Sequence, residues 1–259
     1  MTVYARRGGR VVTSLRSPRG TAFEPNLYSL ENAAPGRRHI IESAFMTCQI
    51  DTVAAGVVAK ILSGQFVSLT NEERSHFARF LLSLRARHPD AIDLVRTRGR
   101  EELLAALRRD PQDYLALKSP SMPSTLVEFV EQRAPGLIEN FGMINLPGLI
   151  ANDTVAERLY RITCWTHEVR HASVDLLLSD RPCVLDGSLV TGACLLALPL
   201  SPTTIFFACS DPVKNATLRN QPATKLVKAL NVSSVSQARE RVYGANAHHL
   251  PFVERYLRR

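Results

Sequence analysis

The sequence has few cysteines, and none of them form a recognisable pattern. The five cysteines stand at positions 48, 164, 183, 194 and 209, an odd number with no CxxC pair. This spacing argues against both a structural zinc site of the usual kind and a disulfide framework. We interpret the cysteines as small buried apolar groups of a protein kept in a reducing compartment.

Long apolar runs are also missing. No uninterrupted stretch of about 18 apolar residues is present, and the best candidate, residues 192–209, is broken by Pro199 and Pro202. The charged N-terminal residues are not followed by the apolar core of a secretory signal. We therefore expect a soluble cytoplasmic protein with no membrane partner.

Several common functional motifs are absent. The chain contains no P-loop, GxGxxG, GxSxG or aromatic RNP-like segment, so the commonest nucleotide-binding, hydrolase and RNA-binding signatures are excluded. No low-complexity tract or internal repeat is visible. A chain of 259 residues with 45% hydrophobic and 22% charged residues is long and apolar enough to bury its own core.

Lysine is scarce, and the positive charge comes from arginine. Five of the 32 basic residues are Lys, and the excess over 24 acidic residues gives a net charge of +8. Residues 1–109 hold 17 basic and 10 acidic residues, and Arg6, Arg7, Arg10, Arg16 and Arg19 precede the first acid. A nucleic acid or another polyanion would therefore meet the N-terminal half. The alternative, which the arginine excess favours, is the composition of a GC-rich genome.

Hydrophobic periodicity predicts an α+β fold in one domain, residues 1–259. We expect a hairpin and loop over 1–38, a helical portion over 39–165, a strand-rich portion over 174–209 and C-terminal helices over 222–259. Within these we expect helices at 40–62, 70–84, 91–109, 124–133, 153–165, 238–243 and 252–257. The helix-rich part would pack on a small, mostly antiparallel sheet formed largely by 174–209.

His167-Glu168-Val169-Arg170-His171 matches the HExxH pattern of zinc hydrolases. On a helix the two imidazoles lie one turn apart and bind one Zn²⁺, while Glu168 acts as general base. The following residues read as strand, and no third ligand is identifiable from spacing, although Asp180 and Asp186 are near. Alternatively, two histidines on the surface or in a turn would account for the same sequence pattern without a zinc site.

Asp180 stands at the end of an apolar strand, in Leu178-Ser-Asp-Arg-Pro182. Polar groups at strand ends often face a cleft, although Ser179 and Asp180 would equally cap the turn before Pro182.

This segment also resembles a bacterial family called domain of unknown function 4238. Further matches lie at Phe23-Glu24, Leu27-Tyr28, Ile41-Glu42, Arg87-His88-Pro89, Trp165, residues 198–202, Asn231 and residues 238–243. The family pattern usually opens with a His-His-Tyr-Val-Pro-like segment, and the sequence begins after the place where it would stand. The resemblance implies no particular reaction.

The matched polar residues form a set that would bind Mg²⁺ and a phosphate group. Glu24, Glu42 and Asp180 are hard oxygen ligands, and Arg87, Arg239 and Asn231 would hold phosphate oxygens. We therefore expect metal-assisted phosphodiester hydrolysis near Asp180, if the fold gathers these side chains in one pocket. The alternatives are a non-enzymatic module that binds nucleic acid or protein, and a zinc hydrolase using His167, Glu168 and His171.

Overall fold

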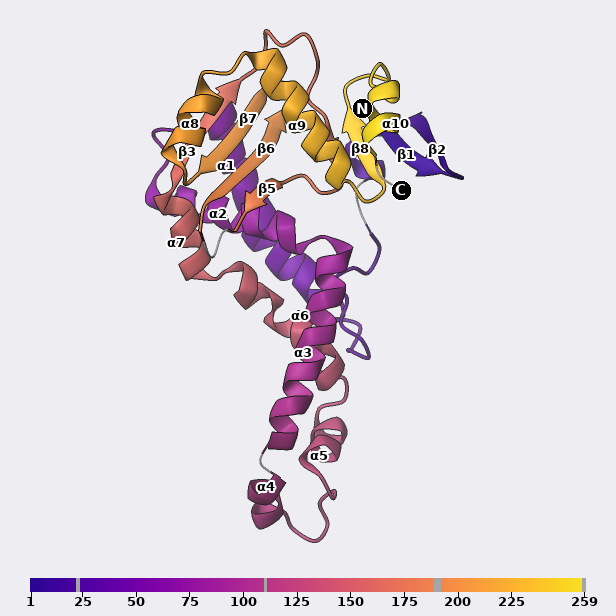
Figure 1. Cartoon of the computed structure of the whole chain (residues 1–259). Helices are drawn as coiled ribbons and strands as arrows, with labels where there is room; N and C mark the ends of the chain where they lie inside the picture. Colours follow the sequence, from indigo (N-terminus) through magenta and orange to yellow (C-terminus); the bar gives the residue numbers. More distant parts are fainter. Residues whose placement is uncertain (22–23, 110, 189–191, 258–259) are drawn as a thin grey trace. The chain divides into compact units, whose positions relative to one another are not determined.

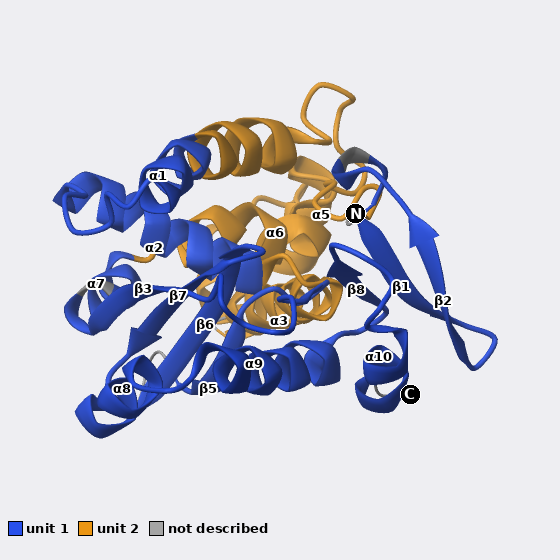
Figure 2. Cartoon of the chain, turned by 90° about the horizontal axis from the view of Figure 1, so that it is seen from above, with its two compact units in different colours: residues 1–23, 53–85, 153–259 blue, residues 24–52, 86–152 orange. Residues whose placement is uncertain are grey.

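The computed structural model describes residues 1–21, 24–109, 111–188 and 192–257 (Figure 1). The described chain has the predicted α+β architecture, with helices and two antiparallel sheets. It divides into two compact units, coloured separately in Figure 2. Unit 1 comprises Met1–Phe23, Val53–Arg85 and Asp153–Arg259, and unit 2 comprises Glu24–Thr52 and Ala86–Asn152. The single-domain prediction stays a prediction.

The first sheet of unit 1 is built on the predicted N-terminal hairpin. Its strand order is β2-β1-β8-β4, all antiparallel. The strands are β1 Thr2–Arg7, β2 Arg10–Leu15, β4 Leu178–Ser179 and β8 Arg241–Gly244. Gly8 and Gly9 both have positive φ, as a two-residue hairpin turn requires. The expected helix at 238–243 is wrong, because residues 238–240 are irregular and residues 241–243 lie in β8.

The second sheet of unit 1 has the order β3-β7-β6-β5. Its strands are β3 Thr163–Glu168, β5 Val184–Gly187, β6 Cys194–Ser201 and β7 Thr204–Cys209. The predicted helix at 153–165 ends at Arg161, because Thr163, Trp165 and Thr166 favour a strand. Strands β6 and β7 are confirmed, while the segment around Leu178 joins the other sheet.

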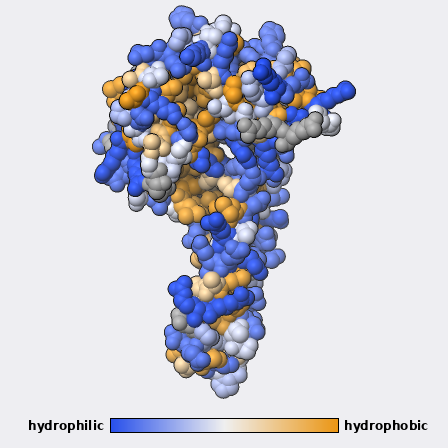
Figure 3. Space-filling view, viewed as in Figure 1, coloured by the Kyte–Doolittle hydropathy of each residue, from blue (hydrophilic) through white to orange (hydrophobic). Residues whose placement is uncertain are grey.

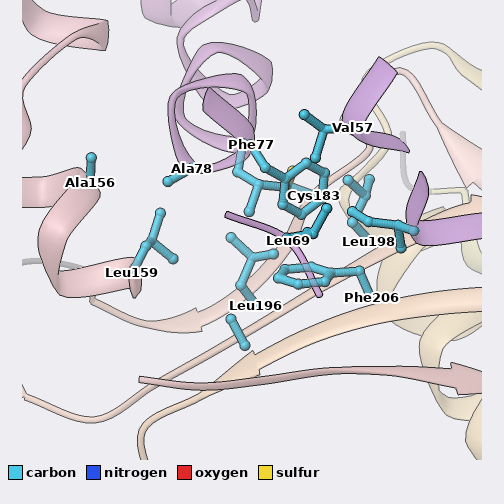
Figure 4. Packing of buried hydrophobic residues seen from close by; sticks show 13 residues of the cluster. Val57, Leu69, Phe77, Ala78, Ala156, Leu159, Cys183, Leu196, Leu198 and Phe206 are labelled. Carbon is cyan, nitrogen blue, oxygen red and sulfur yellow. The ribbon is translucent and has the colours of Figure 1, made fainter. Parts of the chain in front are cut away.

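Helices cover both faces of this second sheet. The helices of unit 1 are α1 Thr52–Leu62, α2 Asn71–Ala86, α7 Asp153–Arg161, α8 Pro212–Arg219, α9 Ala223–Gln237 and α10 Leu250–Tyr256, with a 3-10 turn at Pro18–Gly20. On one face Val57, Phe77 and Leu159 meet Leu196 and Phe206 (Figure 4). On the other face Val227 and Leu230 of α9 pack against the stacked rings of Trp165 and Phe207.

The regular elements of unit 2 are all helices in the part of the chain that the structure describes. Its elements are the π-helix η2 Ile41–Asp51 and the α-helices α3 Pro89–Arg109, α4 Pro111–Leu117, α5 Leu126–Arg133 and α6 Leu137–Ile150. Helices α3 and α6 cross closely at two glycines. A Cβ on Gly99 would lie 2.3 Å from the Cα of Gly142, and one on Gly142 would lie 2.0 Å from the carbonyl oxygen of Val95. Any larger residue at this crossing would push the helices apart.

Candidate functional site

The predicted site residues fall in both units. Glu24, Glu42 and Arg87 belong to unit 2, whereas Asp180, Asn231 and Arg239 belong to unit 1. The proposal that one pocket gathers all six therefore stays a prediction, and each unit has to be described by itself. Phe23 and the side chain of Arg19 lie outside the described residues.

In unit 1, Asp180 holds a backbone turn. Its two carboxylate oxygens accept hydrogen bonds from the backbone N–H groups of Arg239, Glu240 and Arg241, at 2.9, 2.8 and 3.0 Å. Three backbone donors occupy the oxygens that a metal ligand would need to offer. The Asp180 carboxylate thus fixes the start of β8. Arg239 contacts this carboxylate through its backbone N–H group.

Asn231 has an equally structural position. Its side chain is only 3% exposed, its Oδ1 accepts from the N–H of Leu177 at 2.9 Å, and its Nδ2 donates to the carbonyl of Asp175 at 2.8 Å. Both ends of the amide are satisfied by the strand segment that α9 packs against. The Asn231 side chain therefore has no free group for the predicted phosphate binding.

The HExxH letters lie on a strand and a turn. His167 and Glu168 end β3, and His171 follows in the turn after it, so the one-turn helical spacing that places two imidazoles on one zinc ion is missing. The Glu168 carboxylate accepts from the hydroxyl of Thr204 at 2.7 Å and pairs with Arg170. Among the described residues no three His, Cys, Asp or Glu side chains gather as metal ligands. The helical zinc interpretation is therefore corrected.

In unit 2, three of the motif positions come together. The guanidinium of Arg87 forms a bidentate ion pair with Asp51, with Nη1–Oδ2 and Nη2–Oδ1 distances of 3.0 and 2.6 Å. The charges of Arg87, Glu42 and Asp51 act on the hydroxyl of Tyr28, so these three residues lie near it. We call these four residues the tyrosine–carboxylate cluster. Asp51 is the member that sequence reasoning missed.

Polar clamps fix the loop that carries Tyr28. Arg96 of α3 donates to the carbonyls of Leu27 and Ser29, at 3.1 and 2.9 Å. Asn140 of α6 accepts from the N–H of Glu31 and donates to its carbonyl, both at 2.7 Å. These bonds hold a loop without regular secondary structure against the helices, so the Tyr28 ring has a defined place.

The π-helix aligns the two carboxylates of the cluster. In an α-helix, Glu42 and Asp51 would lie on opposite faces, because nine residues at about 100° each end half a turn apart. A π-helix, with i to i+5 hydrogen bonds, has about 4.4 residues per turn, so nine residues make close to two full turns. The buried residues Ile41, Phe45, Met46 and Ile50 repeat at the same wider spacing. That spacing is the signal in the sequence for the π-helix.

The electrostatics of the cluster keep Tyr28 protonated. Burial raises the pKa of the Tyr28 hydroxyl well above its usual value of 10.0, the Arg87 charge lowers it, and the Glu42 and Asp51 carboxylates raise it. The cluster thus combines a neutral hydroxyl donor, two carboxylates and one guanidinium. Glu24, by contrast, makes no hydrogen bond or ion pair with the described residues.

The charge of the chain divides between the two units. Unit 1 contains 22 basic and 11 acidic residues, a net charge of +11, and unit 2 contains 10 basic and 13 acidic residues, a net charge of −3. The expected concentration of charge in residues 1–109 does not follow this structural division, because that segment includes parts of both units.

The N-terminal hairpin concentrates positive charge. Arg7 and Arg10 are exposed and lie directly opposite each other across the Gly8-Gly9 turn. Cross-strand like charges are unfavourable, and neither side chain has an acidic partner among the described residues. Arg6 differs, because it donates to the carbonyls of Gly9 and Leu257 and so anchors the hairpin to the C-terminal segment.

One helix passes a length and composition test for membrane spanning. The continuous helix Ile41–Leu62, formed by η2 and α1, has a mean hydropathy of 1.4 over its best window, of which 33% is buried. Core helices of soluble proteins pass the same test, so this is weak evidence. The segment is not an uninterrupted apolar run, because Glu42, Asp51 and Lys60 lie within it.

The structure thus defines an α+β protein with a basic, sheet-containing unit and an acidic helical unit. Residues 1–248 match the model of the family described as "Protein of unknown function (DUF4238)", and the chain belongs to this family. The match confirms the resemblance carried by the short motifs. Neither the curated proteins nor the solved structures contain a significant match to this chain.

Proposed function

We propose that this protein binds nucleic acid through the basic hairpin of unit 1. The observation that carries the proposal is the opposed pair Arg7 and Arg10, which are exposed and have no acidic partner among the described residues. Like charges placed opposite each other destabilise a free hairpin, and a phosphate backbone relieves that repulsion by neutralising both.

The shape of the hairpin supports the same function. A two-stranded antiparallel ribbon is narrow enough to enter the major groove of duplex DNA or to follow a single strand. The link from Arg6 to Leu257 and the pairing of β1 with β8 hold the ribbon on the rest of the first sheet. The net charge of +11 on unit 1 would attract a polyanion over a longer range.

Fluorescence anisotropy with labelled single-stranded RNA, single-stranded DNA and duplex DNA tests this function. The wild-type protein should bind at low salt, and Arg7→Glu/Arg10→Glu should weaken binding by about tenfold or more, because two phosphate contacts become repulsive. Arg108→Glu/Arg109→Glu, an exposed pair at the end of α3 in unit 2, is the matched control and should retain more of the affinity. Absence of binding by the wild type to all three probes would refute the proposal.

A second candidate is metal-assisted phosphodiester hydrolysis, and the tyrosine–carboxylate cluster favours it. Mg²⁺ commonly uses one or two protein carboxylates together with substrate phosphates. The exposed carboxylate of Glu42 would be the protein ligand, since both oxygens of Asp51 pair with Arg87. Asp180 is not part of this proposed metal site, since its oxygens already accept hydrogen bonds from three backbone amides.

Cleavage of the same labelled nucleic acids with and without Mg²⁺ tests the second candidate. Cleavage should require Mg²⁺ and fall at least about a hundredfold in Glu42→Gln, if Glu42 holds the metal. Glu101→Gln, an exposed carboxylate of α3, should cleave like the wild type. Failure of the wild type to cleave would remove this candidate and leave the binding proposal intact.

A further inference from the structure

An apolar groove lies between η2 and α6, within unit 2. It has a volume of about 490 Å³, inside the range of small-molecule sites. Its lining includes Ile40, Ala44, Phe45 and Gln49 from the segment 40–49, and Ile144 and Gly148 from α6. Among the lining residues, Gln49 is the one with a polar side chain. We call this site the η2–α6 groove.

Small side chains create the hollow. Ala44 and Gly148 face it from the two helices, and a Cβ placed on Gly148 would meet no atom within 4 Å. Large apolar side chains remain open to solvent beside them, since Ile40 is 45% and Ile144 is 47% exposed. Exposed apolar surface around a concave site is typical of a binding surface. The groove would therefore gain free energy by covering these groups with an apolar ligand.

A cationic segment borders the same groove. Arg37, Arg38 and His39 come directly before Ile40, and the N–H of Leu30, another lining residue, donates to the carbonyl of Arg38 at 2.9 Å. The three side chains are exposed and form no ion pair with the described residues. They hold the only basic groups of Glu24–Thr52, in a unit with a net charge of −3.

Apolar walls with cations at one border fit an amphiphile with an anionic head. We propose that the η2–α6 groove binds a long-chain carboxylate, with the alkyl chain between η2 and α6 and the carboxylate at Arg37 and Arg38. The Asp51 carboxylate is already paired with Arg87, so its charge is offset within unit 2. The proposal is independent of nucleic-acid binding, which uses the hairpin of unit 1.

Isothermal titration calorimetry of the full chain with dodecanoate, below its micelle concentration, tests the site. We expect saturable binding of one molecule per chain. Dodecanol should bind more weakly than dodecanoate. Arg37→Glu/Arg38→Glu should weaken dodecanoate binding by about fivefold or more while leaving dodecanol binding unchanged, because only the carboxylate interacts with the arginines.

A variant that fills the groove tests whether dodecanoate binds in the groove or on any exposed apolar surface. Gly148→Leu puts a side chain into the hollow without a backbone clash and replaces a helical glycine, so the variant should fold and lose dodecanoate binding. Gly56→Leu is the matched control in α1, where a Cβ also meets nothing within 4 Å, and should bind like the wild type.

Three results of the binding experiments would overturn the proposal, and the vesicle experiment below adds a fourth. These are an absence of dodecanoate binding by the wild type, unchanged binding by Gly148→Leu, and an equal loss of dodecanol binding in the arginine variant. Sedimentation with phosphatidylglycerol vesicles tests whether the protein binds a membrane surface instead of the free carboxylate. Vesicle binding without binding of the free acid would also count against a carboxylate site.

Discussion

Unit 1 and unit 2 differ in charge and in the forces that hold them together. Unit 1 carries +11 and buries two apolar cores on the faces of a four-stranded sheet. Unit 2 carries −3 and relies on a close glycine crossing and on polar clamps such as those of Arg96 and Asn140. The space-filling view shows hydrophobic colour interleaved with hydrophilic residues around α4 and α5 in unit 2 (Figure 3), where Leu117 is 85% exposed. The difference indicates that the two units depend on different contacts for their stability.

The single tryptophan lets the two units be followed separately. Trp165 is buried in unit 1 against Phe207, so its fluorescence reports on that unit, whereas the helical circular dichroism signal reports on both. The predictions below use this separation.

The largest loss of stability is expected from Gly142→Leu. The new side chain would start 2.0 Å from the Val95 carbonyl oxygen, and overpacking against backbone should cost about 3 kcal/mol or more. Urea unfolding should show loss of helical signal at lower denaturant, with a smaller change in the Trp165 transition. Gly148→Leu, in the same helix with open space, is the control. Equal losses in both variants would contradict the glycine crossing.

Asp180→Ala should have the next largest effect, now in unit 1. Removal of the carboxylate leaves three backbone N–H groups without their partner, at a cost of about 1–3 kcal/mol. The Trp165 transition in urea should move to lower denaturant. Asp186→Ala, which removes only an exposed pair with Lys214, should leave the transition in place. If the two variants behaved alike, Asp180 would have no structural role.

The reactivity of the cysteine thiols should also differ between the two units. Cys48, in unit 2, is exposed, whereas burial raises the pKa of the Cys164 and Cys183 thiols in unit 1 to about 12. These two thiols stay protonated at pH 8 and react slowly, because the thiolate is the reactive form. Titration with a thiol-reactive disulfide dye should show one fast group, absent in Cys48→Ser. Several fast groups in the folded wild type would contradict the burial of the unit 1 cysteines.

The smallest effects concern two matched capping boxes, Thr70–Glu73 of α2 and Thr125–Glu128 of α5. The Glu73 pKa is lowered chiefly by its hydrogen bond with Lys60, and the Glu128 pKa by its hydrogen bond with Ser124. A lowered folded pKa means that each carboxylate stabilises the protein above its ordinary pKa of 4.5, and that this is lost as pH falls through the lowered value.

Thermal melts of Glu73→Gln and Glu128→Gln from pH 7 to pH 3 test the two boxes. Each variant should melt slightly below the wild type at pH 7 and converge with it at pH 3, with Glu73→Gln moving the Trp165 signal. A difference that persists at pH 3 would show that the charge is not responsible.

Local signals in the sequence predicted much of this fold. The N-terminal hairpin, the helix expected at 70–84 and the strands within 174–209 need only neighbouring residues, and all three are confirmed. The helix expected at 124–133 begins at Leu126, with Thr125 as the N-cap that accepts the Glu128 N–H. Helix α6 was missed because Pro147 and two glycines weaken its pattern, while its stability comes from packing on α3.

The candidate site was harder to predict from sequence, because it depends on helix geometry. Glu42 and Arg87 were identified from short motifs, but Asp51, the partner of Arg87, was not, since an α-helical period places it opposite Glu42. Asp180 was selected for its position after a strand, which fits a backbone cap as well as a site. Residue types alone do not separate those two roles.

The salt dependence of nucleic-acid binding tests the central claim most directly. The logarithm of the affinity for a single strand should fall linearly with the logarithm of the salt concentration, and Arg7→Gln/Arg10→Gln should reduce the slope by about 1.4, since each neutralised phosphate contributes about 0.7. Arg108→Gln/Arg109→Gln in unit 2 should leave the slope unchanged. An unchanged slope in the hairpin variant, or an equal reduction in both, would contradict a polyanion site on the hairpin.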